Sequence, residues 1–214
     1  MIRKLRILKS DFIGVYCRVS DNRAIVPYAI EREVSDQIRD YFSVEVIHVH
    51  GETPLVGSLI AMNSQYLVAP EGFLNGSVKN GGITVVTLRE KLNAMGNNIV
   101  MNDRAAIVHK EFSTRSVKKL EDDLDMEVIR SSIGGVKTVG SVSVLTGKGM
   151  LVTPTIRDDE VDFLKNYFKV PVNSGTANFG SIYVGTSILA NRHAIAVGES
   201  TTPIEIGRID DTLS

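Results

Sequence analysis

Several side chains in this sequence have the residue types and spacing that catalysis or metal binding requires. Cys17, the only cysteine, could act as a nucleophile. It lies in an apolar segment between Tyr16 and Arg18, with no histidine beside it in the sequence, which favours a structural thiol. His48 and His50 would share one face of a strand, a spacing that can hold a metal ion, but no third ligand accompanies them. We therefore predict no catalytic residue, metal site or cofactor.

The segment TGKGM, residues 146–150, has the glycines and lysine of a phosphate-binding loop. That interpretation fails because no serine or threonine follows Lys148 and no glycine stands five residues before Gly147. We expect the tip of a hairpin there instead. His109 and His193 fall in or beside short apolar strands, where we expect them to cap or pack.

The elements that would position these residues recur along the chain, which indicates internal repeats. Five times, at intervals of 39 to 45 residues, a glycine is followed by an apolar strand, a polar tip and a second apolar strand. The anchoring glycines are Gly14, Gly57, Gly96, Gly140 and Gly185. The expected tips are Asn22, Asn63, Asn102, Thr146–Gly147 and Asn191, because asparagine and glycine tolerate the positive φ of tight turns. The second strands are almost wholly apolar, which predicts that both of their faces are covered.

An amphipathic helix and a third strand follow the hairpin in most repeats. Helical periodicity marks residues 31–42, 113–124 and 157–168, and residues 201–213 begin with a threonine cap and a proline in the first turn. Residues 71–82, EGFLNGSVKNGG, contain four glycines, so we expect a loop or a single helical turn there.

The fifth repeat has no third strand before Ser214, whereas RKLRIL, residues 3–8, precedes Gly14 much as VEVIHV precedes Gly57. We expect this N-terminal strand to complete the last unit. The predicted fold is therefore a single α/β domain, a closed ring with repeats at roughly 14–56, 57–95, 96–139, 140–184 and 185–214 plus 1–13. Closure removes exposed strand edges, whereas the alternative, an open five-unit solenoid, leaves both ends uncapped.

A closed ring has two rims, and either could bind a partner. Four cations lie next to the expected tips and would share one rim: Arg23, Arg104, Lys148 and Arg192. Such loop charges are commonly no more than solvated side chains. The anchoring glycines and the small residues after them would form the opposite, flatter rim. The residue pattern does not choose between the two rims.

Composition limits the class of protein. Of the 214 residues, 43% are hydrophobic and 23% charged, which is typical of a packed globular protein, and the net charge of −1 argues against generic coating of nucleic acid. A single cysteine excludes an internal disulfide and fits a reducing cytosol. No apolar run approaches the roughly 18 residues that cross a bilayer, and the start of the chain lacks the apolar core of a secretory signal. We expect a cytoplasmic protein with no membrane partner.

Seven segments of the chain resemble archaeal and eukaryotic translation initiation factor 6, in the family's order and over essentially the whole length. They are REKLNAMGN, MNDRAAIVH, DMEVIRSSIGG, VGSVSV, GMLVTP, VPVNSGTANFGS and ESTTPIEIGRID. The resemblance implies the pentein fold, a five-bladed pseudosymmetric α/β propeller. It implies a monomer that binds the large ribosomal subunit near the sarcin–ricin loop, mainly through a ribosomal protein. Bound there, it blocks joining of the small subunit and takes part in large-subunit maturation, without catalysis, cofactor or small-molecule substrate.

The resemblance also points to the glycine rim as the ribosome-binding surface. Carried over to this sequence, the contact residues are Gly14, Ser58, Asn97, Val142 and Thr186. Eukaryotic members carry an arginine where Ser58 stands and a tyrosine where Val142 stands. The eukaryotic C-terminal extension is absent, which favours an archaeal-type factor. Residues 71–82 depart from the helix that the family has there.

Two functions of other kinds are alternatives. Pentein enzymes that act on guanidino groups, the amidinotransferases and deiminases, need a nucleophilic cysteine, usually in the last unit, with a histidine and paired carboxylates. The fifth repeat, GTSILANRHAIAVGES, has no cysteine. An interaction module with another partner would share the ring but not the ribosome. Product formation from arginine analogues, and capture from cytosol with or without ribosomes, would separate these alternatives.

Overall fold

The computed structural model describes residues 2–74, 76–78 and 82–214, which form a mixed α/β protein with five three-stranded sheets and eight helices. In each sheet an inner strand pairs antiparallel with a middle strand, and the middle strand pairs parallel with an outer strand. We number the units one to five by the order of their inner strands. In the order inner, middle and outer, the strands are β2 (Arg18–Val19), β3 (Arg23–Pro27) and β4 (Glu45–Val49); β5 (Ala61–Met62), β6 (Tyr66–Pro70) and β7 (Thr84–Leu88); β8 (Ile99–Met101), β9 (Ala105–His109) and β10 (Glu127–Ser131); β11 (Ser143–Leu145), β12 (Met150–Val152) and β13 (Val172–Ser174); and β14 (Ile188–Ala190), β15 (Ile195–Gly198) and β1 (Ile2–Leu5).

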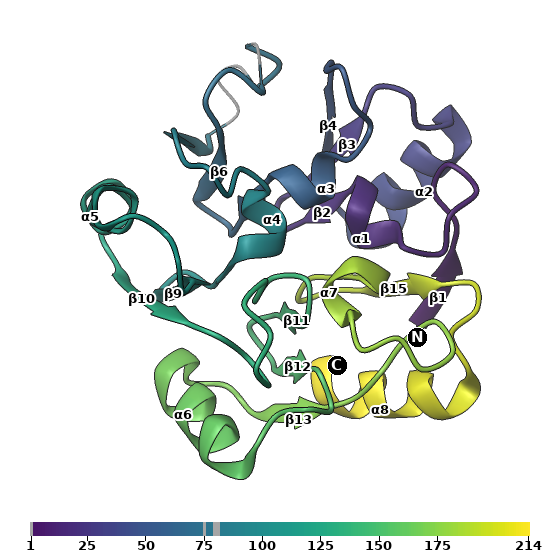
Figure 1. Cartoon of the computed structure of the whole chain (residues 1–214). Helices are drawn as coiled ribbons and strands as arrows, with labels where there is room; N and C mark the ends of the chain where they lie inside the picture. Colours follow the sequence, from purple (N-terminus) through teal and green to yellow (C-terminus); the bar gives the residue numbers. More distant parts are fainter. Residues whose placement is uncertain (1, 75, 79–81) are drawn as a thin grey trace.

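The N-terminal strand lies in the fifth unit. β1 runs parallel to β15, from Ile2 opposite Ile195 to Leu5 opposite Gly198. The inner strands contact one another in the order β2, β5, β8, β11 and β14, and β14 in turn contacts β2. Figure 1 shows the five units around a common centre, with the N-terminus beside the C-terminal units.

The middle strands are buried on both faces, as their apolar sequences predict. Ala24 and Val26 of β3 pack in one core cluster with Ala196 of β15, whereas Ile25 between them packs in a second cluster with Leu67 of β6. The same alternation in the other units places a separate core cluster between each pair of neighbouring sheets. A middle strand therefore needs apolar residues at consecutive positions, because both of its faces are covered.

Four helices of eleven residues cover the outside of the units (Figure 1): α2 (Arg32–Phe42), α5 (Thr114–Leu124), α6 (Asp158–Phe168) and α8 (Pro203–Leu213). These are the four helices that the sequence predicts. In the second unit, the described residues between 71 and 82 form turns and bends without a helix. The other residues of that segment, 75 and 79–81, lie outside the described part. None of the described helices has the length and apolar character needed to span a bilayer.

A single turn separates each anchoring glycine from the strand that follows it, and the sequence prediction did not include this turn. Four of them are the second residue of a single helical turn, in α1 (Ile13–Tyr16), α3 (Val56–Leu59), α4 (Met95–Asn98) and α7 (Val184–Ser187), and Gly140 lies in a non-helical turn. Cys17 accordingly caps the C-terminus of α1 instead of lying in a strand. In Figure 1 these short helices lie near the centre of the view.

Candidate interaction face

The five turns that contain the anchoring glycines pack directly on one another, and we call the surface they form the glycine face. A Cβ added to Gly14 would lie 2.4 Å from the Gly185 carbonyl oxygen, and one added to Gly57 would lie 2.2 Å from that of Gly14. The series continues with 2.0 Å between Gly96 and the Gly57 oxygen, 2.2 Å between Gly140 and the Gly96 oxygen, and 2.0 Å between Gly185 and the Gly140 oxygen. Glycine is required here because the backbone of one turn occupies the space that a side chain on the glycine of the neighbouring turn would need.

A single guanidinium group lies among these turns. Arg18 donates from Nε to the Gly57 carbonyl at 2.8 Å, from Nη2 to that of Gly96 at 2.7 Å and from Nη1 to that of Gly185 at 3.3 Å. Burial lowers the pKa of Arg18 to about 10, so the group stays charged at neutral pH. Beneath it lies a cavity of about 80 Å³, lined by residues of all five inner strands. The arginine thus ties together turns from units that lie far apart in the sequence.

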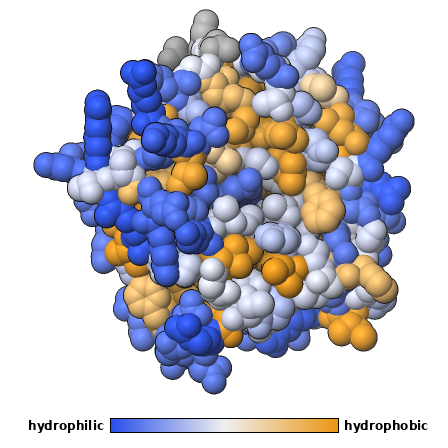
Figure 2. Space-filling view, in the orientation of Figure 1, coloured by the Kyte–Doolittle hydropathy of each residue, from blue (hydrophilic) through white to orange (hydrophobic). Residues whose placement is uncertain are grey.

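The exposed part of the glycine face is apolar or neutral. Three of the residues that stand two positions before a glycine are large and exposed: Phe12 at 42%, Leu55 at 41% and Tyr183 at 46%. The turns that build this face contain no charged residue, namely residues 12–17, 54–60, 92–98, 138–142 and 181–187, and the half-buried Arg18 points its guanidinium among them. Figure 2 shows the consequence, since the middle of this face is mostly white and orange and the blue side chains gather toward its edges.

The structure places the predicted contact residues at this face, with one correction. Ser58, Asn97 and Thr186 are half-buried in the turns, and Gly14 is buried against its neighbour, so only its backbone can contribute. Val142 is fully buried in the core cluster between the third and fourth units. The expectation of a side chain on an exposed rim is therefore wrong for Val142. The turn around Gly140 directs it inward, where it packs in the core.

Asn97 has an unusual side chain. Its Oδ1 atom is buried and has no hydrogen-bond partner among the described residues, whereas its backbone carbonyl accepts from Gly140 and Ser141 at 2.9 and 3.3 Å. A buried oxygen without a donor costs free energy. Reorientation of this amide toward a donor on a bound partner would remove that cost.

The opposite end of the inner strands carries the hairpin tips, which we call the tip face. Asn63 Oδ1 accepts from the backbone N–H groups of Gln65 and Tyr66 at 2.9 and 2.7 Å, and Asn102, Asn191 and Thr146 use their side-chain oxygens in the same way. In the first unit this residue is Ser20, six positions after its glycine as in every other unit, so the assignment of Asn22 is wrong. None of these residues has positive φ, so the side chain's acceptor, and not a left-handed backbone, explains the residue type.

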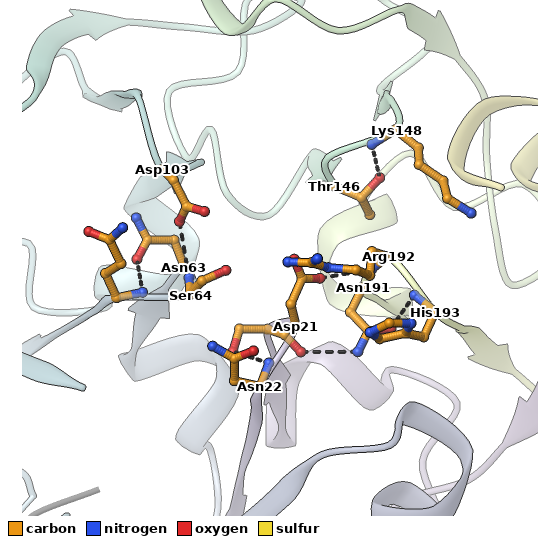
Figure 3. Close-up of polar contacts among 12 residues, drawn as sticks. Asp21, Asn22, Asn63, Ser64, Asp103, Thr146, Lys148, Asn191, Arg192 and His193 are labelled. Atoms are coloured by element: carbon orange, nitrogen blue, oxygen red, sulfur yellow. Dashed lines mark hydrogen bonds and ion pairs between the residues drawn. The ribbon is translucent and has the colours of Figure 1, made fainter. Parts of the chain in front are cut away.

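Two of the four tip cations, Arg23 and Arg192, lie beside carboxylates. Figure 3 shows Arg192 against Asp21 of the neighbouring unit, an ion pair at 2.8 Å, and the backbone N–H of Ser64 donating to Asp103 at 3.2 Å. Arg23 lies 3.6 Å from the carboxylate of Glu45. Carboxylates are therefore interleaved with the cations at this end, which makes it a poor surface for phosphate groups.

The residues whose types suggested chemistry are engaged in structure. Cys17 is fully buried, and burial raises the pKa of its thiol, so it does not form a thiolate at neutral pH. His48 contacts the Ser35 hydroxyl at 3.1 Å, and the His50 ring packs on Tyr28. His109 Nδ1 accepts from the backbone N–H of Glu111 at 3.1 Å, a capping role as predicted. Among the described residues no group of three histidine, cysteine or acidic side chains is placed to hold a metal ion.

Sequence reasoning missed two residues of the glycine face. Arg18 passed as an ordinary strand residue, although it is the only charge at a position that is apolar in the other units. Phe179 lies in the segment VPVNSGTANFGS, which the sequence analysis used only for its resemblance to the family. In the structure this residue is 82% exposed and its φ is 63°.

Comparison with known proteins places the chain in a family. The family model of the eIF-6 family matches residues 2–212. The protein named translation initiation factor 6 from Thermoplasma acidophilum is 47% identical over 216 residues, which covers 100% of each chain, and that from Picrophilus torridus is 46% identical over 217 residues with the same coverage. A protein of that name from Pyrococcus abyssi is 36% identical over 222 residues, covering 99% of this chain and 98% of its own. The chain belongs to the eIF-6 family.

Proposed function

We propose that this protein is an archaeal-type translation initiation factor 6 that uses its glycine face to bind the large ribosomal subunit. Bound near the sarcin–ricin loop, it sterically prevents association with the small subunit, and it takes part in large-subunit biogenesis in the cytoplasm. We further propose that it acts as a monomer with the pentein fold, a closed five-bladed propeller. Family membership, the pairing of β1 with β15 and the contact of Gly14 with Gly185 support the closed ring.

One observation carries the choice of surface. Exposed apolar side chains recur at matching positions of an otherwise neutral face, over turns that cannot move because their backbones touch. A standard protein interface buries about 800 Å² on each partner, which is less than a tenth of the 9870 Å² surface of this chain. A rigid protein of this size that binds tightly where the small subunit must dock would exclude the small subunit sterically. No catalytic chemistry is needed for this.

The predicted contact set is Gly14, Ser58, Asn97 and Thr186, with Val142 acting through the core that supports its turn. Replacing Asn97 by arginine should weaken binding to the large subunit, because it places a long charged side chain on a neutral surface. The fold should be preserved, because the residue is only half-buried.

Sedimentation through a sucrose gradient tests the proposal directly. Wild-type protein should travel with large subunits and keep large and small subunits apart, whereas Asn97→Arg should do neither. Gln65→Arg is the matched control, since it adds the same charge at an exposed position of the tip face. Co-migration of Asn97→Arg at the wild-type level would defeat the choice of face.

The alternative of an enzyme acting on guanidino groups has little support. Such chemistry needs an accessible thiolate, and the one cysteine of the sequence is buried in its protonated form.

A further inference from the structure

The turn formed by Asn178, Phe179 and Gly180 holds an aromatic ring in an energetically unfavourable position. The three residues have φ of 51°, 63° and 93°. Glycine and asparagine adopt this left-handed region readily, but phenylalanine rarely does. Burial does not offset the strain, because 82% of the Phe179 side chain is exposed. The turn itself recurs in the fold, since Leu8 and Lys9 have φ of 50° and 64° between the bridged Ile7 and Ser10, but a large exposed ring at this position contributes little to packing within the chain. The choice of phenylalanine therefore indicates a use outside the folding of the chain itself.

The turn is held rigidly from below. Glu205 of α8 accepts from the backbone N–H groups of Gly180 at 2.8 Å and Phe179 at 3.2 Å, and also from the Thr176 hydroxyl at 2.8 Å. On the other side, the backbone N–H of Asn178 donates to the Thr201 hydroxyl at 3.1 Å. The ring is therefore presented on a fixed backbone, which lowers the entropy lost when it binds.

Phe179 shares its corner of the glycine face with other exposed rings. The Asn178 side chain donates to the Asp11 carbonyl at 2.8 Å, which ties the turn to the residue before Phe12. Tyr183 follows four positions after Phe179, and the turns that Phe12 and Tyr183 precede are in direct contact through Gly14 and Gly185. We call Phe12, Phe179 and Tyr183 the aromatic corner.

The side chains of the aromatic corner favour a protein as the binding partner over a nucleic acid. Residues 170–191 contain no charged side chain, and two cations near them are already engaged, Arg208 with the Ser174 carbonyl at 2.9 Å and Arg6 with Asp11. The acidic groups nearby are already engaged, since Asp11 pairs with Arg6 at 2.7 Å and Glu205 holds the turn. Large aromatic side chains in neutral surroundings are the anchors of protein interfaces, where they fill desolvated pockets.

We propose that Phe179 is a preorganised anchor that inserts into an apolar pocket of a protein component of the large ribosomal subunit, with Phe12 and Tyr183 packing around it. The inference rests on the proposed function, which supplies the large subunit as the partner. It adds the residue that carries the contact.

Substitution by asparagine separates binding from folding. Phe179→Asn removes the ring but suits the left-handed backbone, so the melting temperature should be unchanged or higher. The affinity for purified large subunits should fall at least tenfold. Phe163→Ala, which removes a half-exposed ring from α6 on the outer surface, is the control and should bind like wild type. Wild-type affinity in Phe179→Asn would overturn the anchor, as would a fall in affinity accompanied by a lower melting temperature.

Photo-crosslinking identifies the receiving molecule. A photoreactive phenylalanine analogue at position 179 should link the factor to a ribosomal protein. Linkage to ribosomal RNA, to a second copy of this chain, or to nothing would overturn the inference. Failure of wild-type protein to bind large subunits would instead refute the proposed function, so the two failures are distinguishable.

Discussion

Replacement of Gly96 by alanine tests whether contact between the glycine turns holds the units together. The new Cβ would lie 2.0 Å from the Gly57 carbonyl oxygen and 2.4 Å from that of Ile60, whereas such contacts are essentially never shorter than 3.0 Å. The two turns must therefore separate by about 1 Å. Both atoms that approach the Cβ belong to the backbone, so no side chain can rotate out of the way.

The displacement has a second cost, because the Gly57 and Gly96 carbonyls both accept from Arg18. Overpacking of a well-filled site costs about 1–3 kcal/mol, and loss of a hydrogen bond to a buried charge costs about 1.5–3 kcal/mol. We therefore expect the free energy of unfolding to fall by about 2.5–6 kcal/mol. For a chain of this size each kcal/mol corresponds to about 2–4 °C, so the melting temperature should fall by about 5–24 °C.

Thermal and urea denaturation followed by circular dichroism would measure the effect. Gly147→Ala is the control, because its Cβ would meet nothing within 4 Å and its φ is not positive. It should change stability by less than about 0.5 kcal/mol. If Gly96→Ala is as stable as this control, the close packing of the turns does not stabilise the fold and the reasoning is wrong.

Two further predictions concern the contacts that close the fifth unit and hold its loop. Removal of residues 1–8 deletes β1, uncovers the edge of β15 and removes the fully buried Ile7, so the truncated chain should lose more than about 3 kcal/mol of stability. An identical melting temperature would contradict the role of this strand. Burial alone raises the pKa of Glu205, but the hydrogen bonds that it accepts from Thr202, Gly180 and Thr176 outweigh burial, and its pKa lies below the usual value. The free energy of folding that the ionised Glu205 contributes is therefore fully present above the pKa of the unfolded chain, about 4.3, and is lost as the pH falls through the lower pKa of the folded protein. Glu205→Gln should be less stable than wild type by about 1–3 kcal/mol at pH 7. This difference in stability should become smaller in acid. A difference that is constant between pH 7 and pH 3 would refute this role of the carboxylate.

Much of the fold could be predicted because each unit repeats the same local pattern of apolar and polar residues. The helices α2, α5, α6 and α8 follow from periodic apolar positions, and α8 also from the threonine cap and proline at its start. The buried middle strands follow from consecutive apolar residues. The place of the N-terminal strand followed from counting, since one unit lacked a strand that the other end of the chain could supply.

Apart from the tip of the first unit, the two ends of the inner strands were located correctly, but the residue types found there were explained wrongly. At the tips, asparagine was attributed to positive φ, whereas Asn63 serves as an acceptor for the N–H groups of its own turn. At the glycines, small residues were expected to give a flat rim, whereas the need is for space beside another unit's backbone. A sequence shows that a residue type recurs at a position. The physical reason for that residue type depends on contacts between units, which the sequence does not show. The same limit explains Val142, whose direction depends on a turn that differs from the other four.

Arg18 shows how the repeats must differ where they meet. Four positions after their glycines the units carry Arg18, Ala61, Val100, Val144 and Leu189. All five positions line the same small cavity or the core beside it, so a strict repeat would place five cations there. Two such charges about 6 Å apart would repel by about 3 kcal/mol at an effective dielectric constant of about 20. One guanidinium can satisfy three carbonyls, whereas a second would face the first without a carboxylate to separate them. The five equivalent positions around this cavity therefore cannot all hold arginine. When the repeats are aligned, a single charged residue at a position that is apolar in all other repeats thus indicates that this position lies at the centre, where the units meet.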